Sequence, residues 1–341
     1  MPVMATVRTL MFDSNQRDAV RAGSGDRSAM IRSVMNRSDW AILLALAIIW
    51  GGAFFFISVA VREVPPFTYV WLRLSFAALA LWAYVWWRGG GSGLPGWAWR
   101  SILLLALINN VIPFLLFGWG QTHIASGLAS ILNATTPIWG VVVAHLFTSD
   151  ERMTPRKISG VLLGFGGVAL MLGPDLLRSI GNDGLAQLAC VTASLSYALA
   201  GVWARRFKKQ GISPLAVSTG QLTAGALIML PVALIIDQPW LRPIPSAGAL
   251  AAILALAIVC SALGYVLYFR LIDSAGATNA LLVTLLVPPV AILLGWLFLS
   301  EVIEPRDFAG LGLIAVGLAA IDGRLVSAAT RLRPGALRQA A

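Results

Sequence analysis

The chain has 341 residues, of which 58% are hydrophobic and 12% are charged, and its mean hydropathy is +0.81. A soluble domain carries about 25% charged residues, so this composition excludes a water-soluble core and predicts a membrane protein with lipid as its solvent, and the long apolar stretches described below predict that it is all-α. The net charge of +10 does not indicate a nucleic-acid partner, because the basic residues lie in tails and short loops and form no basic–aromatic stripe.

Residues 1–39 differ from the rest of the chain because they mix six arginines with four aspartates. They contain no apolar stretch of the kind found in a cleavable signal peptide. We expect a disordered, basic cytoplasmic tail, with Met30 and Met35 as alternative starts. Deleting residues 1–29 should therefore leave function intact. The C-terminal tail, residues 323–341, is expected to be similar.

Ten apolar stretches lie between the tails, each close to the roughly 20 residues that a membrane helix needs. Pro and Gly residues bound most of them. The predicted spans are residues 40–61, 67–87, 98–120, 126–147, 155–173, 184–204, 214–236, 247–271, 276–299 and 305–322.

Polar and aromatic side chains deep in the early spans are the first candidates for a binding site. Trp50 and Phe54 lie in the first span, where they either line a pathway or pack between helices. Arg73 lies about six residues, or roughly 9 Å, into the second span. It either reaches the surface or backbone carbonyls, or lines a cavity and attracts a carboxylate. Asn109 and Asn110 in the third span either bind a ligand or join helices.

The fourth span carries Asn133, with the same two interpretations, and then Pro137. In the second half of the chain, Tyr197 occupies a place comparable to that of Trp50. Gln221 matches the depth of Arg73 when the prolines that open both spans, Pro66 and Pro214, are aligned. A polar residue at both matched depths favours a cavity-facing role.

Tyr265 in the eighth span is the last candidate for the pathway lining. Pro288 and Pro289 interrupt the hydrogen-bonding pattern of the ninth span, as Pro137 does in the fourth. These three prolines are either hinges or static kinks.

The sequence indicates no cofactor and no metal site. Cys190 and Cys260 both lie in apolar stretches and are interpreted as small packing residues. His123 and His145 are far apart in the chain and make no cluster. The acidic residues all lie in tails, loops or span ends, so no carboxylate lies mid-span to carry a proton.

Residues 125–171 resemble residues 275–321, which read as a diverged second copy of the same sequence. Matched pairs lie 150 residues apart; they are Ala125 and Ala275, Glu151 and Glu301, Pro155 and Pro305, Gly160 and Gly310, and Gly167 and Gly317. Similar composition alone is the alternative explanation, but the shared acidic–Pro–Gly spacing favours duplication. The glycines also permit close helix contact.

The basic residues predict the orientation in the membrane. With the N-terminus inside, the tails and inner loops hold most of the 25 lysines and arginines, and the outer loops hold only Arg62, Arg178, Arg242 and Arg306. This bias predicts that both termini are cytoplasmic. Five spans in each copy then make the second copy inverted relative to the first, with a site expected near the midplane.

These features resemble the EamA group of the drug/metabolite transporter superfamily over about residues 40–322. The motifs that carry the resemblance are Trp50 to Phe55, Pro66 to Arg73, Pro137 to Arg152, Pro289 to Glu301, and the glycines at 160–167 and 310–317. The Gly-Glu pair common in the family at the ends of its fourth and ninth spans is replaced here by Ser149-Asp150 and Ser300-Glu301. The resemblance implies two five-helix repeats, at residues 40–173 and 184–322.

Membership would imply export, or exchange, of amino acids and other small metabolites across a bacterial-type inner membrane. No Gly-rich phosphate-binding loop is present that would indicate ATP. A membrane-embedded enzyme acting on lipid or isoprenoid substrates is the alternative, together with a scaffold or receptor that transports nothing. The expected partners are a small-molecule substrate and the lipid bilayer, with no nucleic acid, and a homodimer stays an open alternative to a monomer.

Overall fold

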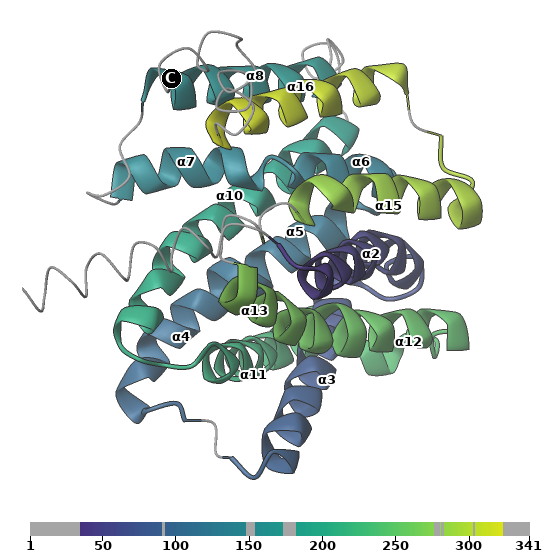
Figure 1. The fold of residues 1–341 in the computed structure, drawn as a ribbon. Helices are drawn as coiled ribbons and strands as arrows, with labels where there is room; N and C mark the ends of the chain where they lie inside the picture. The colour runs from purple at the N-terminus through teal and green to yellow at the C-terminus, as the bar shows by residue number, and fades with distance from the viewer. Residues whose placement is uncertain are drawn as a thin grey trace, which may run out of the picture.

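The computed structural model describes residues 35–90, 93–147, 154–172, 182–275, 280, 283–302 and 304–322 (Figure 1). Within these residues the fold is all-helical and contains no strand, which confirms the predicted fold class at this level. The helices of the first half are α2 (Arg37–Ala60), α3 (Pro66–Trp87), α4 (Trp99–Ala106), α5 (Ile112–Gly120), α6 (Ser126–Asn133), α7 (Thr136–Phe147) and α8 (Pro155–Leu172). Those of the second half are α10 (Asn182–Lys209), α11 (Pro214–Val232), α12 (Ala247–Leu254), α13 (Gly264–Ala275), α15 (Val283–Leu299) and α16 (Pro305–Asp322).

Short segments of other helix types connect several of these elements. They are the 3₁₀ turns η1 (Gly96–Ala98) and η4 (Pro239–Leu241), and the π-helical turns η2 (Leu107–Val111), η3 (Ala233–Asp237) and η5 (Ala255–Leu263). Through η2 and η5, α4 continues into α5 and α12 continues into α13. Each pair therefore forms one long helix with a π segment inside it.

Among the described residues, seven helices are long and apolar enough to cross a membrane. They are Arg37–Ala60, Pro66–Trp87, Gly96–Gly120, Ser126–Phe147, Asp183–Lys209, Pro214–Leu241 and Ala247–Ile272. Their bounds lie within a few residues of the predicted spans, except that the fifth and sixth of these helices run five residues further. The predicted spans 155–173 and 305–322 match α8 and α16, which have 18 residues each, and the 17-residue α15 covers the later part of the predicted span 276–299.

The first helix begins at Arg37, three residues before the predicted start, because a capping box fixes it there. The side chain of Asn36 accepts from the Asp39 backbone N–H at 2.8 Å, and Asp39 Oδ2 accepts from the Asn36 N–H at 3.0 Å. Such reciprocal bonds satisfy two of the unpaired donors at a helix start. Asp39, expected in the tail, is instead a buried residue of the first turn.

The two halves interleave instead of forming separate bodies. Helix α2 packs against α15, and α10 packs against α7. Helices α8 and α16 lie side by side at the top of Figure 1. Their contact is reciprocal: a Cβ on Gly167 would come within 2.6 Å of Gly310 O, and a Cβ on Gly317 within 2.6 Å of Gly160 O. Only glycine permits backbones this close.

The prolines have different effects on the two spans that carry them. The fourth span breaks between Asn133 and Thr136, directly before Pro137. By contrast, α15 continues through Pro288 and Pro289 without interruption.

Candidate functional site

Arg73 is a buried cation near the centre of the fold, with only 6% of its surface exposed. Its Nε donates to Ser261 Oγ at 3.1 Å, and Nη1 donates to Tyr69 Oη at 3.0 Å. The guanidinium carbon lies 3.7 Å from the centroid of the Phe114 ring. Among the residues that the structure describes, no carboxylate pairs with it. An aromatic face and two hydroxyls therefore hold a charge whose counter-ion the described chain does not supply.

A second polar cluster, the amide cluster, joins three helical segments beside Arg73. Asn109 Nδ2 donates to Gln221 Oε1 at 2.9 Å and lies 3.4 Å from Tyr265 Oη, which in turn donates to Asn110 Oδ1 at 3.0 Å. Asn110 is fully buried, and its Nδ2 has no hydrogen-bond partner within the described chain. The structure thus brings four predicted site residues together and leaves one buried donor free.

The two asparagines face this cluster because η2 adds a π turn to the helix. The Ile112 N–H bonds to Leu107 O, five residues back, and Pro113 has no N–H to offer. The carbonyl of Ile108 is therefore free, and Ser196 Oγ from α10 donates to it at 2.6 Å. Single π turns inside α-helices occur frequently at functional sites.

The second half repeats this arrangement with its own residues. In η5 the Gly264 N–H bonds to Val259 O, five residues back, and to Ser261 O, so it does not bond to the carbonyl of Cys260 four residues back. Trp50 Nε1 from α2 donates to that carbonyl at 3.1 Å. In each case the first helix of one half supplies the donor and the third span of the other half supplies the acceptor.

The predicted aromatic residues lie around these clusters. The Phe54 and Phe117 rings meet edge to face at 5.4 Å, and the Tyr197 ring stacks on Phe117 at 6.1 Å. The Trp50 ring lies 5.1 Å from that of Tyr268. Of the four predicted residues, Phe54 is buried, whereas Trp50, Tyr197 and Tyr265 are partly buried.

Asn133 is not part of the amide cluster. It ends α6 at the break, where Thr136 Oγ1 donates to its backbone oxygen at 2.7 Å and lies 3.4 Å from its side-chain oxygen. Pro137 follows this break. Pro288 and Pro289 lie in the part of α15 that packs on α2, where Gly51 leaves room for Val287 O and Val290. The hinge role of the three prolines stays a prediction.

Sequence reasoning missed Tyr69, Ser261 and Phe114 as partners of Arg73. Tyr69 precedes Arg73 by four residues, a spacing that places two side chains on one helix face, so it could have been found. Ser261 is 188 residues away in the chain, and no local signal connects it to Arg73. The described residues contain no group of three or more potential metal ligands.

This arrangement offers three kinds of contact to a small polar molecule. The guanidinium supplies a fixed positive charge, the amide cluster supplies a free donor, and the aromatic rings supply apolar walls. A small number of polar groups in a largely aromatic surround is typical of small-molecule sites. The site contains no acid–base pair of the kind that catalysis requires.

Comparisons with known proteins agree with this description. A sequence model of the EamA-like transporter family matches residues 39–173 and again residues 184–321. The chain is 24% identical over 281 residues to the uncharacterized transporter YoaV of Bacillus subtilis, covering 81% of this chain and 94% of that one. It is 28% identical over 278 residues to the uncharacterized inner membrane transporter YedA of Escherichia coli, covering 80% and 86%.

Protein PecM of Dickeya dadantii is 27% identical over 249 residues, covering 72% of this chain and 81% of its own. A solved crystal structure superposes with a TM-score of 0.61 at 19% identity, covering 86% of this chain and 99% of the other, which supports the fold alone. The two family matches together span most of the chain, and the relatives named as transporters match over most of their length. The chain is therefore a multi-pass membrane protein and not an enzyme, and it belongs to the EamA-like transporter family.

Proposed function

We propose that this protein exports small amphipathic metabolites, amino acids foremost, by alternating access at the central site. The observation that carries the proposal is Arg73, a buried guanidinium that no carboxylate of the described chain neutralises. A buried cation without a counter-ion is costly, and a substrate carboxylate would remove that cost on binding. The free Asn110 Nδ2 supplies a second contact for the same ligand.

The proposal includes ten spans arranged as two inverted five-helix repeats. It is supported by the two separate family matches, by the reciprocal glycine contacts of α8 and α16, and by the paired π turns η2 and η5. An odd number of spans per repeat, with basic residues gathered on one side, supports cytoplasmic termini in a bacterial-type inner membrane. A monomer and a homodimer both fit, because one chain contains the whole site.

Within the site, the proposed substrate contacts are Arg73, Asn109, Asn110, Gln221 and Tyr265. Trp50, Phe54 and Tyr197 form the proposed walls. Asn133 and the prolines at 137, 288 and 289 belong to the moving parts of the pathway, not to the polar centre. Exchange of access from one side to the other then requires the halves to rock around this centre.

The test is counterflow of labelled amino acids in proteoliposomes, with and without an imposed proton gradient. We expect saturable uptake that falls at least tenfold in Arg73→Gln. Arg88→Gln is the matched control, because Arg88 lies at the exposed end of the same helix, near the Tyr84 ring. Full uptake by folded Arg73→Gln protein would refute the carboxylate-binding role. If folded wild-type protein showed counterflow of none of the labelled amino acids, amino acids would be refuted as substrates.

A further inference from the structure

Three carboxylates gather at one end of the molecule, and each binds the start of a helix from the opposite half. Glu301 accepts from the Ser126 N–H at 2.9 Å and from Ser126 Oγ at 2.7 Å at the start of α6, with the Gly127 N–H at 3.3 Å. The partners are 175 residues apart in the chain. Helix starts carry unpaired N–H groups and a partial positive charge, so carboxylates bind them well.

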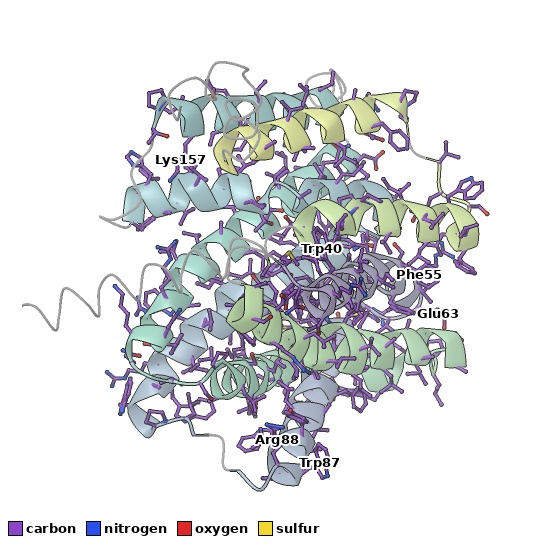
Figure 2. The ribbon with its side chains drawn as sticks, viewed as in Figure 1. Trp40, Phe55, Glu63, Trp87, Arg88 and Lys157 are labelled. Atoms are coloured by element: carbon purple, nitrogen blue, oxygen red, sulfur yellow. The ribbon has the colours of Figure 1, made fainter. Side chains whose placement is uncertain are left out.

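The other two contacts repeat this pattern. Asp237 Oδ2, after α11, accepts from the Thr68 N–H at 2.6 Å and from Thr68 Oγ1 at 2.9 Å at the start of α3. Glu63, after α2, accepts from the Ser246 N–H and Ser246 Oγ at 2.7 Å each, just before α12. Figure 2 labels Glu63 on this side of the molecule.

All three contacts lie on the same face. The end of α2, the start of α6 and the end of α15 meet around one cavity of about 440 Å³, which is lined by Arg62, Gln121, His123 and Glu301 among others. Ser58, which also lines the cavity, donates to Gln121 Oε1 at 3.0 Å. Phe54 lies one helical turn further along α2 from Ser58, and its ring meets Phe117. The cavity thus ends above the aromatic walls of the central site.

The opposite face is joined differently. There, Ser274 Oγ donates to Asp39 Oδ1 at 2.7 Å across the halves, while Asp39 also caps its own helix.

We infer that Glu63, Asp237 and Glu301 form a gate that closes this face, and that the protein opens toward this side by releasing them from the three helix starts. This inference rests on the proposed alternating access, because any rocking that separates the halves at this face must break these contacts. Gly295 fits the same role. A Cβ there would overlap Glu301 Oε2, so glycine keeps the carboxylate in its bound position.

The test measures how fast a thiol behind the gate is labelled. Ser58→Cys is introduced after Cys190 and Cys260, the chain's two cysteines, are replaced by alanine. Ser58 lines the cavity but is buried, with 5% exposed, so a maleimide should react with a thiol there slowly while the face is closed and faster when the face opens. The protein is placed in lipid nanodiscs, where the reagent reaches both faces. The labelling rate then reports the fraction of molecules that are open on this side.

Glu301→Ala is expected to raise the labelling rate about tenfold, because it removes charge-assisted bonds that hold the closed state. Gly295→Ala keeps the carboxylate but displaces it, and should also raise the rate. Ser274→Ala is the matched control: it removes a bond between the halves at the opposite face and should leave the rate unchanged or lower it.

The gate would be overturned if Glu301→Ala and Gly295→Ala both left the labelling rate within twofold of that of the Ser58→Cys protein without altering the thermal midpoint. An equal rise in Ser274→Ala would also overturn it, because general loosening would then explain the result. Counterflow of amino acids, measured in the same Ser58→Cys variants, separates the gate from the proposed transport function. Transport with unchanged labelling refutes the gate alone, and changed labelling without transport of any amino acid refutes the proposed substrate class alone.

Discussion

Asn110 provides a sharp test of whether the amide cluster serves binding or packing. Its side chain is fully buried, Oδ1 accepts from Tyr265 Oη at 3.0 Å, and Nδ2 has no partner among the described residues. A buried donor left without a partner costs about 1–3 kcal/mol. A residue kept only for packing gains nothing from this cost, whereas a residue that binds substrate recovers it in the loaded state.

The perturbation is Asn110→Leu, alone and combined with Tyr265→Phe. The single change removes the unpartnered Nδ2, which should raise the free energy of unfolding by about 1–3 kcal/mol. It also removes the acceptor of the Tyr265 hydroxyl, which should lower that free energy by a similar amount, so the two effects should nearly cancel. The double change removes both ends of the bond. It loses about 1 kcal/mol of hydrogen bonding and still removes the free donor, so we expect it to stabilise the protein by about 0–2 kcal/mol.

The assay pairs unfolding midpoints in detergent with amino-acid counterflow. Both variants should fold at least nearly as well as the wild type while losing tenfold or more in transport, since stability and activity often oppose each other at a site. Tyr268→Phe is the control, because Tyr268 lies on the same helix and contacts the Trp50 ring instead of the amide cluster. A double variant that is destabilised by more than about 2 kcal/mol, or that transports normally, would refute this reasoning.

Two further predictions concern the frame around the site. Hydrogen bonds from the Ser246 N–H and hydroxyl hold the pKa of the Glu63 carboxyl below its ordinary value. A lowered folded-state pKa adds stability that is present above the unfolded pKa and is lost as the pH falls through the folded value. Glu63→Gln should therefore lower the thermal midpoint at pH 7, and the difference from the wild type should close below about pH 4.5; a constant difference down to pH 3 would contradict this. Gly317→Ala should cost about 1–3 kcal/mol, because the new Cβ meets backbone on α8. Gly312→Ala, with nothing within 4 Å, should be neutral or slightly stabilising in the same thermal measurement, and equal losses in both would be inconsistent with the close helix contact.

The helices were predictable because their signal is local. Apolar runs of the right length, bounded by Pro and Gly, fixed most ends within a few residues. The start of α2 differs because Asn36 and Asp39 extend the helix into a charged segment that hydropathy assigns to the tail. Hydropathy indicates which part of the chain lies in the membrane, but the capping residues determine where the helix begins.

The candidate site was predictable in its members but not in its construction. Depth and polarity in an apolar span singled out Arg73, Asn109, Asn110 and Gln221, because buried polar groups need partners. Tyr69 is a local partner of Arg73, but other partners lie more than a hundred residues away in the chain, such as Gln221 for Asn109 and Ser261 for Arg73. Glu63, Asp237 and Glu301 were likewise predicted only as residues of loops or span ends, because the helix starts that they bind are distant in the chain.

The π turns η2 and η5 have a consequence for chain length. Each holds one residue more than the α-helix it interrupts, and one residue turns everything beyond it by about 100° around the helix axis. Deleting a single residue from 107–111 would therefore leave the hydrophobicity of the span almost unchanged, yet it would turn Phe114 away from Arg73 and Phe117 away from Phe54. In these two spans the number of residues is as much a determinant of the binding site as their identity.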